Sequence, residues 1–459
     1  MIQYIFYQLL RGSFLFILWY MVLLGFIGAA RMIYALFTVS GRVSGKRSMK
    51  YMRPGSAANA VPISLLTPVC NEEAAIIDTI KSMLNQNYSN YEIIVINDGS
   101  TDNTLNTIID SFSMRKITYP FRERLATKKV RAIYYNQYIP RLKVIDKENG
   151  GRSDALNAGL NLSRFPWFLS IGADSLLGEN ALQRLSAVFV EHKYTAAAWG
   201  TVRVANGSAF EDGKLTGTGI SRNIWALLQT IEYFRLFLVG RSGRNSLNYR
   251  LFYPGSFGAF QKEPVLAAGG FSAGMAGEET DLVIKLQRYM RSKKFKYRMC
   301  FVPDSICWIR APESPGKIGM QRFRWQAGLK DVLARNRDMF LNPGCGVFGM
   351  LALPLYFLFE LASPLIEFLG YILVPLAWLF GVVSPDALAV FCMVIVFFGM
   401  INSAGALLAE ELTGSKYISA KDTLLLGVLC IVENLFYRQM TMFFRLMGLL
   451  GSRRKPRAL

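Results

Sequence analysis

Histidine and patterned cysteine are nearly absent from this chain of 459 residues. His192 is the only histidine, so we do not expect chemistry that needs a histidine base or a histidine-bound metal. The six cysteines are scattered without metal-ligand spacing, which predicts reduced thiols. Acid–base work must therefore fall to carboxylates.

Acidic residues are also scarce, with 32 Asp and Glu against 52 Lys and Arg and a formal net charge of +20. Such an excess suits nucleic acid, an anionic membrane surface or an anionic substrate. The chain has neither zinc-finger spacing nor an aromatic signature of RNA binding, so we expect no nucleic acid partner. An anionic substrate, an anionic leaflet and the basic bias of cytosolic membrane flanks account for the charge more simply.

Long apolar runs indicate membrane spans in a chain that is 52% hydrophobic with a mean hydropathy of +0.25. The run from Phe14 to Tyr34 is long enough to cross a bilayer, which takes about 20 residues. A basic segment follows it, with Arg42, Lys46, Arg47, Lys50 and Arg53. This asymmetry predicts that the next domain is cytosolic.

Further apolar runs fill the C-terminal quarter. Residues 346–383 are too long for one span, and we interpret them as two short spans or a bent, partly re-entrant pair. Leu388–Leu408 is a clearer span, and Thr423–Leu450 is apolar despite Glu433, Asn434 and Arg438. An ionisable residue at the centre of a span costs about 2.5–3.5 kcal/mol, so these polar residues should face protein or water. A cytosolic basic terminus at 452–457 requires an even number of crossings after the cytosolic domain, and four fits best.

Between these regions, from Val61 to about Asp304, short apolar strands alternate with helical segments. The predicted strands are Ile63–Thr67, Glu92–Asn97 and Trp167–Ile171. The predicted helices are Glu72–Gln86, Asn103–Phe112, Asp154–Leu162 and Asn180–His192. This alternation predicts a mostly parallel sheet covered by helices, with ligands at the carboxyl ends of the strands. The polar, basic segment Ser113–Lys143 is interpreted as an insertion or mobile loop.

Two polar loops follow neighbouring predicted strands, TPVCNEE at 67–73 and NDGSTD at 97–102. Together they can form a crevice for a nucleoside, in which Asp98 accepts hydrogen bonds from a base N–H or a ribose hydroxyl. Taken alone, NDGST is more often a strand–turn–helix connection with Asp or Ser as the helix cap.

The segment KENGGRSDALNAGL at 147–160 combines two glycines, two cations and the start of a helix. Lys147 and Arg152, flanking a helix N-terminus, suit a diphosphate. The alternative is a glycine-rich turn before a helix capped by Ser153.

Two acidic sites come later in the chain. Asp174, in SIGADSLL at 170–177, follows a strand and can ligate Mg²⁺ or Mn²⁺ beside a diphosphate, although a lone Asp is weak evidence for a metal. GEETDL at 277–282 can supply a general base that deprotonates an acceptor hydroxyl. The alternative is that its three acids only complement a helix dipole.

Residues Lys317–Phe340 are interpreted as a basic amphipathic helix at the cytosolic membrane surface. One face carries Ile318, Trp325, Leu329 and Val332. Arg322, Arg335 and Arg337 of the same segment can reach phosphates or water. Within this helix, QRFRW at 321–325 offers Arg324 for a departing diphosphate and Trp325 for a sugar ring; the alternative is an interfacial Trp–Arg anchor.

In order and spacing, these motifs resemble those of the processive membrane glycosyltransferases of family 2, the cellulose, hyaluronan and poly-N-acetylglucosamine synthases. The Gln-x-x-Arg-Trp match is complete and is the most specific element. The resemblance covers nearly the whole chain. It implies a GT-A fold, Rossmann-like with a mostly parallel sheet, in a cytosolic domain joined to an α-helical transmembrane region, and it implies an inverting reaction.

The resemblance also implies roles for individual residues. The catalytic carboxylates are Glu279, Glu278 and Asp174, with Asp174 as the metal ligand for Mg²⁺ or Mn²⁺. Nucleotide, diphosphate and acceptor contacts fall to Thr67, Glu72, Asp98, Lys147, Arg152, Gln321, Arg324 and Trp325. Two positions depart from the family: Gly172 replaces the first Asp of Asp-x-Asp, and Glu279 stands where the family has Asp.

The resulting prediction is an enzyme of the bacterial inner membrane that moves a sugar from a UDP-sugar to a growing β-linked polysaccharide and exports it. The predicted regions are 1–40 as a transmembrane helix, 41–316 as the cytosolic domain, 317–342 as the interfacial helix and 343–459 as three to four spans. Its partners are the donor, a saccharide acceptor and the bilayer, with room for an accessory or regulatory membrane subunit. Two alternatives stay open: transfer of one sugar to a lipid, and a non-catalytic receptor or scaffold that keeps the fold.

Overall fold

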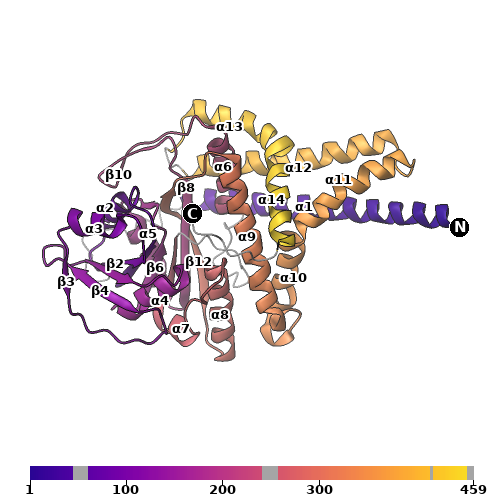
Figure 1. The fold of residues 1–459 in the computed structure, drawn as a ribbon. Coiled ribbons are helices and arrows are strands. Elements are labelled where there is room, and N and C mark those ends of the chain that lie inside the picture. The colour runs from indigo at the N-terminus through magenta and orange to yellow at the C-terminus, as the bar shows by residue number, and fades with distance from the viewer. Residues whose placement is uncertain (45–59, 240–256, 414–416, 452–459) are drawn as a thin grey trace.

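The computed structural model describes residues 1–44, 60–239, 257–413 and 417–451. The basic residues Lys46, Lys50 and Arg53 and the basic terminus at 452–457 lie outside these ranges. A mixed sheet and a group of long helices make up the described chain (Figure 1).

The sheet has ten strands in the described chain, and most of them run in one direction. In spatial order they are β3 (Arg115–Ile117), β4 (Val130–Tyr135), β5 (Leu142–Lys147), β2 (Tyr91–Asp98), β1 (Ile63–Val69), β6 (Trp167–Ile171), β11 (Phe257–Gln261), β8 (Thr195–Val204), β12 (Arg298–Ile309) and β7 (Ser175–Leu177). Only β4, β11 and β7 oppose the other strands. A separate hairpin joins β9 (Ala209–Glu211) to β10 (Lys214–Gly217).

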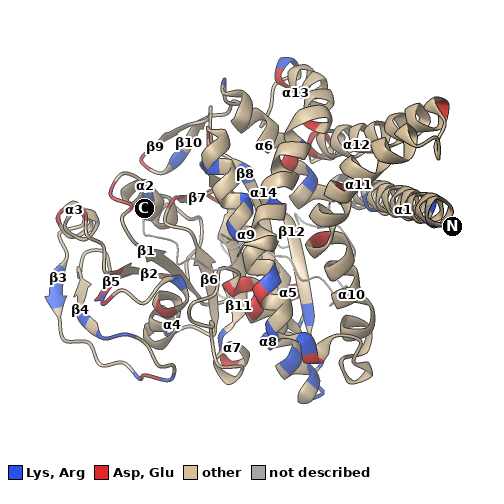
Figure 2. Cartoon of the chain, turned by 45° about the vertical axis from the view of Figure 1, so that its right-hand side comes forward, with Lys and Arg blue, Asp and Glu red and all other residues tan. Residues whose placement is uncertain are grey.

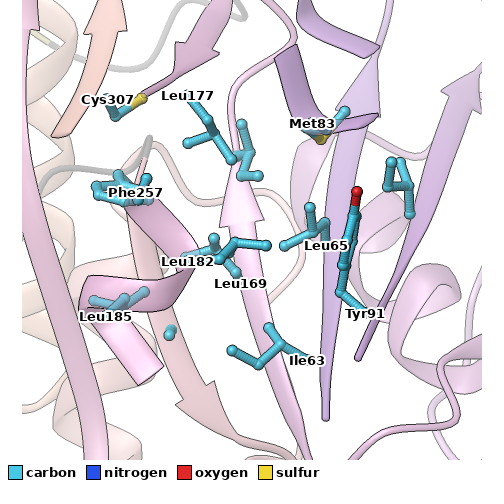
Figure 3. Close-up of a cluster of buried hydrophobic side chains, with 14 of the residues drawn as sticks. Ile63, Leu65, Met83, Tyr91, Leu169, Leu177, Leu182, Leu185, Phe257 and Cys307 are labelled. Atoms are coloured by element: carbon cyan, nitrogen blue, oxygen red, sulfur yellow. The ribbon is translucent and has the colours of Figure 1, made fainter. Parts of the chain in front are cut away.

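Helices cover both faces of this sheet, which explains why its central strands are apolar without alternation. One face packs against α2 (Ile76–Leu84), α3 (Thr104–Ser111) and α5 (Ala181–Glu191). The other packs against α4 (Arg152–Leu162), α7 (Lys262–Ala267) and α8 (Glu278–Ser292). Within β1, Ile63 and Leu65 enter the first core and Leu66 enters the second. Figure 3 shows the first core, in which Leu65 lies near Leu169 of β6.

The remaining helices form a bundle beside the sheet. Its N-terminal and central members are α1 (Ile2–Ser44), α6 (Ile224–Phe234), the π-helical η3 (Arg235–Val239) and α9 (Pro315–Arg335). Short segments follow as η4 (Arg337–Met339), η5 (Pro343–Cys345), η6 (Phe348–Ala352), α10 (Leu353–Tyr356) and η7 (Phe357–Leu361). The chain ends with α11 (Ser363–Leu379), α12 (Pro385–Leu412), α13 (Ala420–Val432), η8 (Glu433–Tyr437) and α14 (Arg438–Leu450).

Two helices of the described chain are long and apolar enough to cross a membrane, Gln3–Phe37 and Pro385–Leu412. They contain the predicted runs at 14–34 and 388–408. Phe348–Leu361 and Ser363–Leu379 meet the criterion only as a pair bent by 45°, which agrees with the bent interpretation of 346–383. In Figure 1, α1, α11 and α12 project together away from the sheet.

The predicted span Thr423–Leu450 is helical, as α13, η8 and α14, but is not among the spans that meet this criterion. The number of crossings within 343–459 therefore stays a prediction, as do the region boundaries. Helix α6, which lies inside the predicted catalytic region, packs among bundle helices through Leu228 and Ile231.

The interpretation of Ser113–Lys143 as an irregular insertion is wrong, because it contains β3, β4 and the start of β5. The edge strand β3 and its neighbour β4 carry the exposed basic residues Arg115, Lys116 and Arg131, so their sequence lacks the apolar run of a buried central strand. The predicted helix Glu72–Gln86 begins later, at Ile76. Residue Asn71 has a positive φ of 57°, and the Glu72 N–H donates to the Thr104 hydroxyl, so this stretch is a loop held by α3.

Helix α9 confirms the predicted helix over the main part of 317–340, with one side packed inside the protein, and its position at the membrane surface stays a prediction. It buries Ile318, Leu329 and Val332, and Lys330 donates to the Leu449 carbonyl of α14. Its neighbours are α8 on one side and α14 on the other, as Figure 1 shows.

Candidate active site

Strands β5, β2, β1 and β6 are adjacent and parallel, so their carboxyl ends lie at one edge of the sheet. Glu72 follows β1, Asp98 ends β2, Arg152 follows β5 and Asp174 follows β6. The sheet order thus gathers four of the predicted site residues, which are scattered over a hundred positions of sequence, at one edge.

Asp98 and Lys147 form the centre of a buried cluster with Asp154, here called the loop anchor. The Lys147 ammonium lies 2.6 Å from Asp98 Oδ1 and 2.6 Å from Asp154 Oδ1, and donates to the Glu148 carbonyl at 2.6 Å. Asp98 also accepts the N–H groups of Gly150 at 3.0 Å and Gly151 at 2.7 Å. The contacts of Lys147 with Asp98, Asp154 and the Glu148 carbonyl use all three N–H donors of its ammonium group.

The loop anchor fixes the turn between β5 and α4. Gly151 has a φ of +85°, which an L side chain rarely adopts, and a Cβ on Gly150 would come within 2.5 Å of the Asp154 carboxylate. Lys147 is fully buried and binds Glu148 and Asp154, which lie on either side of the two glycines, so it stabilises this turn. Direct nucleotide contacts of Asp98 and Lys147 therefore gain no support from these bonds and stay predictions.

Glu72 and Asp174 lie on the same edge of the sheet and influence each other electrostatically. Burial raises the pKa of Glu72, and the negative charges of Asp174 and Asp102 raise it further. Asp174 is exposed, with the Ser175 hydroxyl 3.4 Å from its Oδ1. Thr67, in contrast, is fully buried in β1, and its hydroxyl lies 3.4 Å from the Met83 sulfur. A nucleotide contact of Thr67 thus stays a prediction.

The carboxylates of Glu278 and Glu279 begin α8 and face α4. Arg152 bridges them, with Nε 2.9 Å from Glu278 Oε1 and Nη2 2.8 Å from Glu279 Oε1. Both glutamates are 8% exposed, and the Arg152 side chain is 34% exposed. We call Glu278 and Glu279, together with the Arg152 that bridges them, the carboxylate pair. Figure 2 shows acidic and basic residues together where α8 meets α9.

Burial raises the pKa of Glu279 to about 7, since the favourable charge of Arg152 offsets only part of the desolvation and Glu278 adds repulsion. Burial alone would lower the pKa of Arg152, but Glu279, Glu278 and Asp174 together raise it. A carboxylate poised near neutral pH is suited to general base catalysis.

Backbone contacts hold α9 against the start of α8. A Cβ on Gly328 would lie 2.9 Å from the Ala276 carbonyl carbon, and a Cβ on Gly277 would lie 3.1 Å from Val332. Asp281 in the first turn of α8 accepts from the Ser272 hydroxyl at 2.5 Å. In the sequence, Asp281 has no signal of its own beyond its place in an acidic helix start.

The Gln321–Trp325 motif lies about one turn before Gly328 along α9. The expectation that Arg322 reaches phosphates or water is wrong, because its guanidinium is buried 2.5 Å from Glu232 Oε2 and 4.3 Å from the Trp325 ring centroid. Arg322 also donates to the Gln321 side chain at 3.1 Å. It therefore holds two motif residues, whereas Arg324 is exposed.

The carboxylates fit a divalent metal bound together with phosphates. In the described part of the chain, no group of three His, Cys, Asp or Glu residues could hold a metal alone. Mg²⁺ and Mn²⁺ at phosphate sites need only one or two protein carboxylates, because phosphate oxygens and water complete the coordination. Asp174 meets this requirement, because it is exposed and because its charge raises the pKa of Glu72, a second carboxylate on the same edge of the sheet.

Comparison with protein families now identifies the chain. The family described as "Glycosyl transferase family group 2" matches residues 167–401, which include Asp174, Glu279 and Trp325. "Glycosyl transferase family 2" matches residues 64–255, which include Asp98 and Arg152. This chain belongs to glycosyltransferase family 2. It is a glycosyltransferase, and the alternative of a non-catalytic scaffold is set aside.

Curated relatives of this glycosyltransferase include poly-β-1,6-N-acetyl-D-glucosamine synthases. That of Staphylococcus aureus strain COL is 27% identical over 325 residues, covering 70% of this chain and 67% of the relative. That of Staphylococcus epidermidis is 27% identical over 275 residues, covering 60% of this chain and 56% of the relative. A solved mannosyltransferase from Pyrobaculum calidifontis, in complex with GDP-Man and Mn²⁺, aligns with a TM-score of 0.50 at 16% identity over 91% of this chain and 99% of its own. The fold is thus GT-A with a mixed, mostly parallel sheet, as predicted.

Proposed function

We propose that this enzyme transfers a sugar from a UDP-sugar onto a growing β-linked polysaccharide and passes the product through its membrane helices. The observation that carries the proposal is the buried, Arg152-paired Glu279 at the start of α8, beside the sheet edge that carries exposed Asp174. Similarity to relatives named poly-β-1,6-N-acetyl-D-glucosamine synthase supports a polysaccharide product.

The chemistry assigns one role to each part of the site. Glu279 takes the proton of an acceptor hydroxyl, and the hydroxyl oxygen forms a bond to the anomeric carbon of the donor. The bond from that carbon to the diphosphate breaks on the opposite side, so configuration inverts and UDP leaves. A divalent ion held by Asp174 and the diphosphate would neutralise charge on the leaving group. Exposed Arg324 supplies a further positive charge there.

We assign the enzyme to the bacterial inner membrane as a multi-pass protein with a cytosolic catalytic domain. Support comes from the two span-length apolar helices and from the surplus of basic residues. The protein partners in this proposal are limited to an accessory or regulatory membrane subunit; the other partners are donor, acceptor and lipid.

A transfer assay tests the proposal with full-length protein in detergent or nanodiscs. Radiolabelled UDP-N-acetylglucosamine and other common UDP-sugars are supplied with Mg²⁺ or Mn²⁺, and incorporated label is measured. We expect transfer that chelation abolishes and that Asp174→Asn reduces by about 10²-fold or more, because the metal ligand is lost. Glu263→Gln, an exposed glutamate paired with Arg124, is the matched control and should keep full activity.

Product size separates polymer synthesis from the alternative of one sugar added to a lipid. Gel filtration of labelled product should give long chains, whereas a single lipid-linked sugar would replace the polymer proposal with the alternative. Absence of transfer from every common UDP-sugar, with or without the products of neighbouring genes, contradicts the proposed donor class.

A further inference from the structure

The buried side of the Gln321–Trp325 motif is tied to a carboxylate from a distant part of the chain. Glu232 lies in the last turn of α6, and its Oε2 accepts a hydrogen bond from Arg322 Nη2 at 2.5 Å. The same oxygen accepts from the hydroxyl of Tyr437, at the end of η8, at 2.7 Å. Arg322 and Tyr437 are both enclosed by protein. One carboxylate oxygen thus joins α6, α9 and η8.

The guanidinium that Glu232 binds also contacts two residues of the motif. Arg322 Nη1 donates to Gln321 Oε1 at 3.1 Å, and the central guanidinium carbon lies over the Trp325 ring, 4.3 Å from its centroid. A guanidinium is planar and rigid, so a bond that fixes one of its edges also fixes the direction of its face. The position of the Glu232 carboxylate therefore bears on the orientation of the Trp325 ring.

Other contacts hold the backbone of α9 at this point. Gln326, the residue after the motif, donates to the carbonyls of Glu360 at 3.1 Å and Leu361 at 3.0 Å. Its side-chain oxygen accepts from Arg445 Nε of α14 at 3.0 Å. These bonds do not involve α6. Loss of the carboxylate on α6 should therefore leave α9 in place and change the side chains that face it.

A second ion pair crosses the same interface without a residue of α9. Arg235 Nη1, in the π-helical continuation of α6, lies 2.6 Å from Glu433 Oε1 of η8. The hydroxyl of Ser403, from α12, donates to Glu433 Oε2 at 2.5 Å. If Glu232 only neutralised a buried cation, the loss of either carboxylate should have the same consequences. An effect confined to Glu232 would have to pass through α9.

We propose that Glu232 is a positioning residue for sugar transfer, which acts through Arg322 to orient the Trp325 ring toward the acceptor saccharide. The Tyr437 hydroxyl holds this carboxylate from the helical bundle. The inference rests on the proposed function and on the acceptor contact predicted for Trp325. Its consequence is that acceptor binding depends on the contact between α6, α9 and η8, whereas donor binding at the sheet edge does not.

Fluorescence of the full-length protein tests the positioning without any substrate. The chain has seven tryptophans, so the Trp325 signal is taken as the difference between each protein and the same protein carrying Trp325→Phe. Glu232→Gln should raise the quenching of this signal by acrylamide, because the ring loses the guanidinium that covers one face. Glu433→Gln, the matched change at the second ion pair, should leave the quenching as in wild type.

Transfer kinetics test the consequence for the reaction, with UDP-N-acetylglucosamine as donor and a short β-1,6-linked N-acetylglucosamine oligosaccharide as acceptor. Tyr437→Phe removes one hydroxyl from Glu232, and the acceptor KM should rise about two- to tenfold, the range for one lost hydrogen bond, with the donor KM unchanged. Ser403→Ala removes one hydroxyl from Glu433 and is the matched control, with both KM values unchanged. Glu232→Gln should raise the acceptor KM further, because charge-assisted bonds are lost.

A double variant checks that the effect passes through Arg322. In protein that already carries Arg322→Lys, Glu232→Gln should raise the acceptor KM by less than it does in wild type, because the two changes break the same contact. Independent, multiplying effects on the acceptor KM would contradict a path through Arg322.

The two measurements separate failure of this inference from failure of the proposed function. Unchanged Trp325 quenching in Glu232→Gln, or an equal rise in acceptor KM in Glu232→Gln and Glu433→Gln, refutes the positioning role. If Glu232→Gln does not fold, Tyr437→Phe decides by the same measurements, because it leaves the ion pair intact. If wild type transfers sugar from no common UDP-sugar, the proposed function fails and the catalytic part of this inference with it, while quenching still decides whether Glu232 orients Trp325.

Discussion

The loop anchor and the carboxylate pair each include a cation beside the turn between β5 and α4, Lys147 before the turn and Arg152 after it. The two cations differ in burial and in the charges that surround them. Lys147 is fully enclosed, and its three acceptors lie at 2.6 Å. Arg152, five residues later, is one-third exposed and forms ion pairs with two buried glutamates that repel each other. A saturated cluster stabilises one conformation, whereas a cluster with raised pKa and an exposed member can change partners. The charges of the loop anchor therefore support the turn, whereas those of the carboxylate pair are suited to chemistry.

The largest expected effect comes from removing the base in the carboxylate pair. Glu279→Gln keeps the shape and a hydrogen-bond acceptor but cannot take a proton, so kcat should fall by about 10²–10⁴-fold. Calorimetry should still detect UDP binding. Full transfer by this variant would show that Glu279 is not the base, and the carboxylate pair would then have no catalytic role to set against the structural role of the loop anchor.

Breaking the loop anchor should instead cost stability. Lys147→Met leaves Asp98 and Asp154 buried without their cation, and removal of one partner from a buried ion pair costs about 3–5 kcal/mol. Thermal unfolding in detergent measures this loss, with Glu263→Gln as the exposed-pair control. A stable Lys147→Met protein with selectively weakened UDP binding would instead support the predicted nucleotide contact of Lys147.

The pH dependence of the rate sharpens the same contrast. Because the base works only when deprotonated and the pKa of Glu279 is about 7, kcat/KM should fall as pH drops below 7. Well below that value the loss should approach about tenfold per pH unit. A rate profile that stays flat down to pH 5, in protein that remains folded, would contradict a base with this raised pKa.

A smaller effect is expected at the Gln321–Trp325 motif. Arg322→Lys keeps the charge opposite Glu232 but loses the planar group that stacks on Trp325. We expect the acceptor KM to rise several-fold while UDP affinity is unchanged, because Trp325 becomes less well positioned. Arg335→Lys, on the same helix, is the matched control. Equal loss of donor and acceptor affinity would indicate general damage to α9.

Much of the sheet could be predicted from sequence, since buried parallel strands are continuous apolar runs. Trp167–Ile171 was predicted at its observed bounds, and the β1 and β2 predictions lie inside the observed strands. The edge strand β3 and its neighbour β4 cannot be predicted in this way, because their exposed residues Arg115, Lys116 and Arg131 are basic. For Arg322 the sequence favours a position facing water, as for most arginines on helices, but Glu232 pairs with it in the interior.

By itself the sequence determined the inventory: one histidine, a set of carboxylates after apolar strands, a Gln-x-x-Arg-Trp motif and apolar runs of membrane length. Only the tertiary structure decided which charges meet. Arg152 and Glu279 are 127 residues apart, and they pair because the sheet order carries α4 to the start of α8. Their burial then sets the pKa of Glu279, and burial depends on the packing of distant segments, which local sequence does not encode.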